Sequence, residues 1–277
     1  MSTGAMSISG DSMISAKYRT PLSTPLLAAA LATVLASMLA SAGARAEPRD
    51  DFLAGRTKTC AGCDLTGANF KRRDLTGADL TGAKLTDANF HDAKLTGARL
   101  AGADLTGANL NKANLSRAQL TGAVLHEAML YGAILDAAAL DSADFTDAMM
   151  GTAHLLRSNL ANAVLRNADM RKTRLTDAVL TGADLTDAAL DEAFARGAKL
   201  DGATLSGTRL MGAELVEASL VGADLHEANA LHANMRGADL TRANLADANL
   251  RLANLYEAKL DGATLRATTM PDGTTQP

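Results

Sequence analysis

A large apolar side chain or, in two cases, an alanine occupies every fifth position from Leu65 to Met270, and the register never changes. Leucine fills 33 of these 42 central positions, and the residue two places earlier is alanine in 36 of the 42 repeats. Neither regular element accommodates this period, because five residues turn an α-helix by roughly 140° and an odd period sends successive strand residues to opposite faces. Each repeat is therefore expected to be a short strand followed by a bend, with glycine at many of the corners.

The repeats Ala68-Asn69-Phe70, Ala78-Asp79-Leu80 and Ala103-Asp104-Leu105 resemble those of pentapeptide-repeat proteins, whose consensus is A-(D/N)-L-x-x. The resemblance covers about Cys63 to Met270. It implies an all-β fold, a right-handed quadrilateral parallel β-helix with four repeats per coil and with alanine and leucine facing inward. At ~4.8 Å per coil, the repeats would form about ten coils and a rod roughly 50 Å long.

One feature of the sequence supports four repeats per coil independently of the resemblance. Seven central positions hold Phe or Met, and five of these fall at the same place in a twenty-residue coil: Phe70, Phe90, Met150, Met170 and Met270. Stacking of bulky side chains from coil to coil would produce this sorting.

Residues 1–46 have the organisation of a secretory signal peptide. Residues 26–40 are predominantly apolar, basic residues precede them, and Ala44-Arg45-Ala46 provides a small-x-small cleavage site before Glu47. We expect cleavage before Glu47 and a periplasmic or secreted protein. The alternative is an uncleaved segment that anchors the protein to a membrane, although the run is short for a span of ~20 residues.

The mature chain is expected to have three parts. Residues 47–62 would cap the β-helix of residues 63–270, with Phe52 and Leu53 over the open first coil, and residues 271–277 would be a short polar tail.

Three central or inward positions break the pattern. Arg73 replaces an inward alanine, and a distorted or open first coil would let its guanidinium reach water. Ala195 and Ala230 underfill two central positions, which leaves either small voids or local bulges that turn Phe194 and Leu231 inward.

The net charge is −4, and residues 47–277 carry 24 basic and 30 acidic side chains. Both signs are interleaved along the chain. This balance argues against sequence-independent nucleic-acid binding, which needs a basic face, and it also differs from a uniformly acidic, DNA-like surface.

Cys60 and Cys63 are the only cysteines, in a C-x-x-C spacing. Asp64 stands where covalent haem attachment needs histidine, a zinc site would need further ligands, and a thioredoxin-like βαβ setting is absent. We expect a local disulfide or packed thiols at the first coil, with oxidation favoured by export. Similar cysteine pairs open many pentapeptide-repeat proteins.

No catalytic or metal-binding arrangement emerges from the remaining residues, and we expect no cofactor. The five histidines take outward positions without metal-ligand spacing: His91, His126, His154, His226 and His232. The Asp and Asn residues that precede the central position recur with the repeat, so we expect them to make turn and ladder hydrogen bonds. The basic residues Arg171, Lys172 and Arg174 are expected to be solvated surface.

The outward position before the central residue is often apolar between residues 124 and 194. We expect Met129 and Met149 to stack on adjacent coils with Tyr131 beside them, and Ile134 and Leu156 to lie on the neighbouring face. The hypothesis is that these five residues, the mid-rod patch, contact a protein partner or a second copy in a homodimer; scattered surface apolar residues are the alternative.

These observations favour an exported, non-enzymatic structural or interaction module whose partner the sequence does not identify. The family resemblance supplies an alternative, because some pentapeptide-repeat proteins mimic duplex DNA and protect type II topoisomerases from quinolones. The predicted export and the interleaved charges depart from that function. An enzyme is the third interpretation and would require a pocket on a convex rod.

Overall fold

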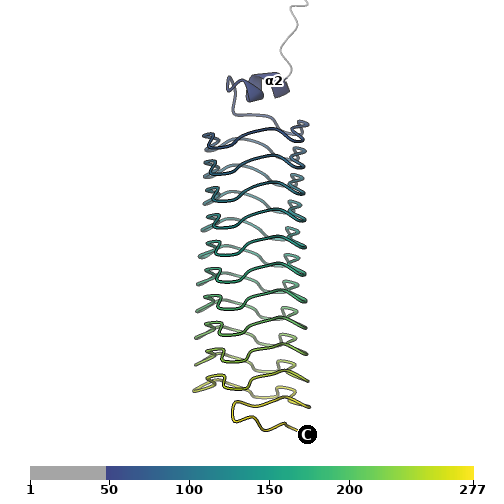
Figure 1. Cartoon of the computed structure of the whole chain (residues 1–277), viewed down its shortest axis with the longest axis vertical. Coiled ribbons are helices and arrows are strands. Elements are labelled where there is room, and N and C mark those ends of the chain that lie inside the picture. The colour runs from purple at the N-terminus through teal and green to yellow at the C-terminus, as the bar shows by residue number, and fades with distance from the viewer. Residues whose placement is uncertain (1–47) are drawn as a thin grey trace, which may run out of the picture. The chain divides into compact units, whose positions relative to one another are not determined.

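A computed structural model describes residues 48–277; the predicted signal peptide and its cleavage site lie outside the described residues. The described chain opens with helix α2 (Pro48–Leu53). From there on it is built of isolated parallel β-bridges rather than longer strands, each joining a residue to the one twenty positions later, from Thr59 with Asp79 to Asn249 with Thr269. Twenty residues are four pentapeptides, so each coil has four sides, and the coils stack into a rod (Figure 1). Among residues 48–277, no helix has the length and apolar character needed to cross a membrane.

Each corner of the coil is a tight turn. In the repeat of Leu65, the amide N–H of Ala68 donates to the carbonyl of Leu65 at 3.0 Å, and Gly67 has φ of +63°. A positive φ at the second turn residue alone is typical of a type II turn, which favours glycine there. Many non-glycine residues nevertheless take this conformation, Arg72 (φ +57°) among them. The turn geometry is therefore imposed by the coil and not by glycine alone.

All five backbone N–H groups of a typical repeat have a partner, as the repeat centred on Phe90 illustrates. Three donate to neighbouring coils: Asn89 to Ala68 at 2.9 Å, Phe90 to Asn109 at 2.7 Å, and Asp92 to Asn111 at 2.9 Å. A fourth closes the turn, and the fifth, on His91, donates to the side-chain Oδ1 of Asn89 at 3.0 Å. The Asn or Asp before the central residue thus completes the hydrogen bonding of the backbone.

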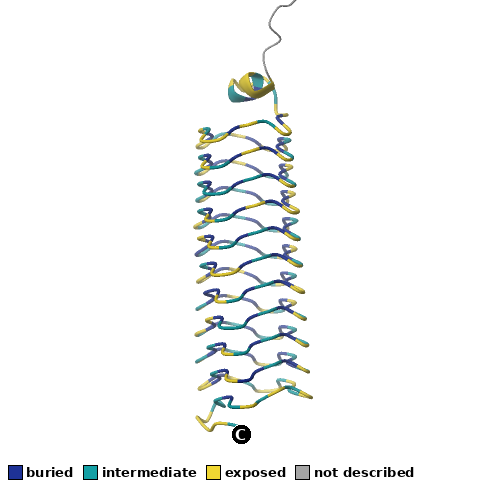
Figure 2. Ribbon diagram, turned by 90° about the vertical axis from the view of Figure 1, so that its right-hand side faces the viewer, coloured by how far each residue is buried: buried dark blue, intermediate teal, exposed yellow. Residues whose placement is uncertain are grey.

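The core is the column of alanine and central side chains inside the coils, where burial alternates with exposed corners (Figure 2). Four inward positions carry a hydroxyl, and each donates to a backbone carbonyl at 2.7–2.8 Å: Ser158, Thr173, Thr208 and Thr268. Ala195 and Ala230 both point inward, while Phe194 is 48% exposed. The chain keeps its register at these sites, so the bulge that would turn Phe194 inward does not form.

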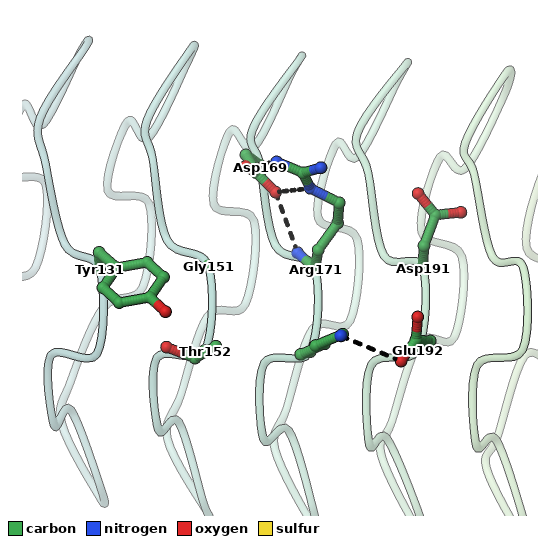
Figure 3. Close-up of a pocket in the computed structure, with 8 residues that line it drawn as sticks. Tyr131, Gly151, Thr152, Asp169, Arg171, Asp191 and Glu192 are labelled. Atoms are coloured by element: carbon green, nitrogen blue, oxygen red, sulfur yellow. Dashed lines mark hydrogen bonds and ion pairs between the residues drawn. The ribbon is translucent and has the colours of Figure 1, made fainter.

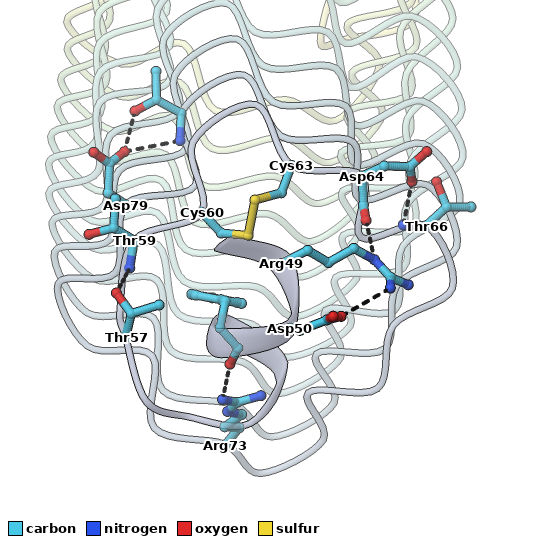
Figure 4. Close-up of a disulfide and its surroundings, with 12 residues drawn as sticks. Arg49, Asp50, Thr57, Thr59, Cys60, Cys63, Asp64, Thr66, Arg73 and Asp79 are labelled. Atoms are coloured by element: carbon cyan, nitrogen blue, oxygen red, sulfur yellow. Dashed lines mark hydrogen bonds and ion pairs between the residues drawn. A yellow bond between two sulfur atoms is a disulfide. The ribbon is translucent and has the colours of Figure 1, made fainter. Parts of the chain in front are cut away.

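Helix α2 covers the first coil. Phe52 is fully buried and packs edge-on against Phe70, with ring centroids 5.7 Å apart. The coil is regular around Arg73, so the expected distortion is wrong, and the side chain is half-buried. Its guanidinium donates to the carbonyls of Phe52 and Leu53 at the end of α2, and it lies 5.5 Å from the ring centroids of Phe52 and Phe70 (Figure 4). The helix carbonyls satisfy the charge that was expected to need solvent.

The C-terminal residues fold back on the last coil instead of trailing from it. Thr275 pairs antiparallel with Thr269, and the N–H of Met270 donates to the carbonyl of Thr274 at 2.7 Å. This hairpin covers one side of the last coil.

Candidate interaction surfaces

The recurring carboxylates of the repeat are part of its turns. Asp79 accepts hydrogen bonds from the hydroxyl of Thr81 at 2.7 Å and from its N–H at 3.2 Å. These bonds favour the ionised carboxylate and lower the pKa of Asp79. The same arrangement with Thr241, aided by Lys259, lowers the pKa of Asp239 to about 2. Such residues stay charged at neutral pH, and their oxygens are already engaged with the backbone.

An apolar residue before the central position cannot accept the hydrogen bond from the backbone N–H. An Asn or Asp side chain of the preceding coil can accept it instead. In the repeat that contains Met129, the N–H of Tyr131 donates to Oδ1 of Asn111 at 2.8 Å. The N–H of Leu156 likewise donates to Oδ1 of Asp136 at 3.0 Å, in a repeat where His154 precedes the central residue. The five-residue pattern does not reveal this compensation, whose signal is an Asn or Asp twenty residues earlier.

The mid-rod patch is divided between exposed and half-buried residues. Met129 and Met149 are bridge partners on adjacent coils. Tyr131 is 56% exposed and Met149 49% exposed, whereas Met129, Ile134 and Leu156 are half-buried. Leu156 of the patch and the exposed ring of Phe194 line a shallow hollow.

Beside the patch lies a hollow of about 390 Å³ (Figure 3). Its lining includes Gly151, which is buried and is the one glycine directly after a central residue in the repeat array. A Cβ at Gly151 would lie 3.4 Å from the ring of Tyr131. Across the hollow, Arg171 forms a two-point contact with Asp169, at 2.8 and 2.6 Å, and Lys172 pairs with Glu192 at 3.3 Å.

Charge is sorted by face, and the expectation of interleaved signs is wrong on one side of the rod. The side whose central residues run from Leu65 through every twentieth residue to Leu265, hereafter the acidic face, carries three basic residues, Lys84, Arg166 and Arg266. Its eleven carboxylates are Asp64, Asp87, Asp104, Glu127, Asp144, Asp147, Asp184, Asp187, Asp224, Glu227 and Asp247. The other three sides together are close to neutral. Reading charges in chain order hid this face, because consecutive repeats point to different sides.

Cys60 and Cys63 form a disulfide across the first corner, with Cα atoms 5.3 Å apart (Figure 4). The N–H of Cys63 also donates to the carbonyl of Cys60 at 3.2 Å, so the bridge spans one turn. Beside it, Arg49 of α2 donates to the carbonyl of Asp64 at 2.8 Å.

The histidines remain on the surface and separate from one another. Nδ1 of His126 lies 3.0 Å from the carbonyl of Thr146, and its ring lies 3.4 Å from Glu127. Within residues 48–277, no group of three or more His, Cys, Asp or Glu side chains could hold a metal ion.

Comparison with known proteins identifies the repeat. The model of the family described as pentapeptide repeats matches eight times, within residues 63–136 and 138–270. HetL, a pentapeptide repeat protein involved in heterocyst differentiation regulation from the cyanobacterium Nostoc sp. strain PCC 7120, is 34% identical. That match covers 82% of this chain and 97% of HetL, with a TM-score of 0.50.

Two further solved structures share the repeat less completely. Rfr23 from the cyanobacterium Cyanothece 51142 is 35% identical over 35% of this chain and 61% of its own, with a TM-score of 0.27. QnrB1, a plasmid-mediated fluoroquinolone resistance protein, is 21% identical over 73% of this chain and 93% of its own, with a TM-score of 0.40. A search of curated proteins finds no match to the chain. The family matches and the continuous twenty-residue bridge pattern agree: this chain belongs to the pentapeptide-repeat family, and its fold is a right-handed β-helix.

Proposed function

We propose that the chain is an exported, non-enzymatic interaction module, a rod of about ten coils that binds a partner protein through its outer surface. The acidic face is the observation that carries the proposal. Eleven carboxylates against three basic residues give this side of the rod a net negative charge, which attracts a partner with a basic surface. Pentapeptide-repeat proteins are in general structural or interaction modules, which agrees with this role.

The export component rests on separate observations. The apolar run of residues 26–40 is followed by the small-x-small sequence before Glu47. The Cys60–Cys63 disulfide is a bond that persists in oxidising compartments. Both features are expected of a periplasmic or secreted protein.

The test reverses charge at two corners of the acidic face and at two matched corners of the opposite face. Glu127→Lys with Glu227→Lys alters the acidic face, and Glu217→Lys with Glu257→Lys is the control. All four residues occupy the same turn position, with φ of +56° to +59°, so the backbone cost of the change is matched.

The experiment crosslinks the chain in intact cells of its host and compares the products of the two variants. We expect one crosslinked protein to be lost from the acidic-face variant, to be retained by the control, and to decrease with added salt because the attraction is electrostatic. Equal retention by both variants would contradict binding through the acidic face.

The acidic face also favours a second function, inhibition or protection of a type II topoisomerase by mimicry of DNA. Interleaved charges argued against DNA mimicry, and the acidic face removes that objection. The predicted export still argues against this function. A gyrase supercoiling assay with the purified chain separates the two functions: inhibition that is lost in the Glu127→Lys/Glu227→Lys variant supports mimicry, and unchanged supercoiling argues against it.

A further inference from the structure

Outward residues at the position after the central residue form a row along a second side of the rod. The carbonyl of each accepts a hydrogen bond from the preceding coil, which fixes their order along the axis. Towards the C-terminus the row reads Asn111, Tyr131, Gly151, Arg171, Asp191, Met211, Leu231 and Arg251. Figure 3 shows its middle part, from Tyr131 to Asp191.

This row is complementary to itself when it is reversed. If a second copy is turned end for end, with the twofold axis between the coils of Arg171 and Asp191, residues equally distant from the axis face each other. The facing pairs are then Arg171 with Asp191, Gly151 with Met211, and Tyr131 with Leu231. Because both rods have the same coil spacing, alignment of one pair brings the others into register, and the twofold axis repeats each pair.

Shape supports the same alignment. Met211 is 43% exposed. In the reversed copy it faces the hollow that Gly151 and the ring of Tyr131 line. The lining of the hollow is mostly polar and charged, and an unbranched, flexible methionine would pack there against the aromatic ring of Tyr131. Tyr131, 56% exposed, gains the half-buried Leu231 as a neighbour.

The adjacent row of corner residues has the same symmetry in charge. Lys172 and Glu192 are exposed and pair within one chain at 3.3 Å. In the reversed copy Lys172 faces Glu192 of the second chain, so the two pairs become a four-charge network about the axis. Arg171, which holds the half-buried Asp169 of its own chain, then also lies opposite Asp191. Asp191 is paired with Arg209 of its own chain at 3.1 Å.

We propose that this side of the rod is a homodimer interface in which a second copy of the chain binds antiparallel. We assign a second copy to this surface because Met211 and the hollow lie on it at equal distances from one twofold axis. The acidic and basic side chains are arranged about the same axis. The inference goes beyond the proposed function: the interface uses a different side of the rod and leaves the acidic face of each protomer free for its partner.

A disulfide between copies tests the arrangement directly. Within one chain, Gly151 and Met211 are three coils apart, or roughly 14 Å at ~4.8 Å per coil, which is too far for a disulfide. The Gly151→Cys/Met211→Cys variant is therefore expected to give a covalent dimer on oxidation, and each single variant to remain uncrosslinked. Failure of the double variant to crosslink would overturn the proposal. Crosslinking by Gly151→Cys alone would overturn it too, because Gly151 faces Met211 and not its own counterpart in the proposed antiparallel register.

Sedimentation of the full chain provides the second measurement. We expect a dimer whose dissociation constant rises at least tenfold in Lys172→Glu and in Glu192→Lys, and returns towards the original value when the two changes are combined. Lys199→Glu, an exposed charge on another side, is the control and should leave the constant unchanged. A monomer at all concentrations, or no rescue by the double change, would overturn the proposal without bearing on the acidic face.

Discussion

Filling the underpacked centre at Ala195 tests the description of the core. Ala195 is inward and only 2% exposed, and its N–H donates to Glu214 at 2.8 Å as the register requires. The central residues directly before and after it along the axis are Leu175 and Leu215. A leucine at this position would therefore stack between two leucines, in a coil whose backbone matches that of its neighbours.

The magnitude follows from the added carbon atoms. Leucine exceeds alanine by three carbons, and at ~0.8 kcal/mol per buried methylene the upper limit is about 2.4 kcal/mol. Partial inward relaxation around Ala195 reduces the gain, and we expect Ala195→Leu to stabilise the protein by about 1–2 kcal/mol. The reverse change at the neighbouring coil, Leu175→Ala, should cost about 2–5 kcal/mol because it creates a cavity.

Guanidinium unfolding followed by circular dichroism measures both changes, with the slope of the transition compared to check that the same surface unfolds. If Leu175→Ala destabilises as expected but Ala195→Leu also destabilises, the coil has closed around Ala195 and offers no space. That result would refute the inference that the core keeps one cross-section along the rod.

Three further predictions concern the ends and the turns. Arg73→Ala should raise amide exchange in α2 and the first coil and cost about 1.5–3 kcal/mol, since two hydrogen bonds from a charged donor are lost; unchanged exchange would show that the guanidinium does not hold the helix. Replacing both Cys60 and Cys63 with alanine should lower unfolding free energy by about 2 kcal/mol, the chain-entropy value for so short a loop, and an identical denaturation midpoint would contradict it. Because the pKa of Asp239 falls from 3.8 to about 2 on folding, its stabilising contribution is present above pH 3.8 and is lost as pH falls towards 2. In Asp239→Asn, the free energy of unfolding should therefore fall less steeply as pH decreases from 3.8 towards 2. Denaturant unfolding at several pH values measures this slope, and a slope equal to that of the unaltered protein would count against this role.

The repeat itself was predictable because its physics is local. A five-residue apolar period excludes a helix and a straight strand, and the Asn or Asp before the central residue matches the backbone N–H that it satisfies, as Asn89 does for His91. Family resemblance then supplied the coil of four repeats that the bridges between residues i and i+20 show.

The remaining features depend on contacts between distant positions. Arg73 looked like a core defect, because a six-residue helix has too little periodicity to reveal that its carbonyls would meet the guanidinium. The acidic face and the hollow at Gly151 become visible only when residues are aligned at intervals of twenty. Once the coil length of twenty residues is known, Glu127, Asp147 and Asp187 fall into one row, although the chain between them passes along the other three sides of the rod.

The central claim, an exported interaction module, is tested most directly by fractionating the native host and measuring the intact mass of the recovered protein. The account predicts a periplasmic or secreted chain that begins near Glu47 and contains no free thiol. A full-length chain in the cytoplasm with two reduced cysteines would contradict it and would direct attention to the topoisomerase assay.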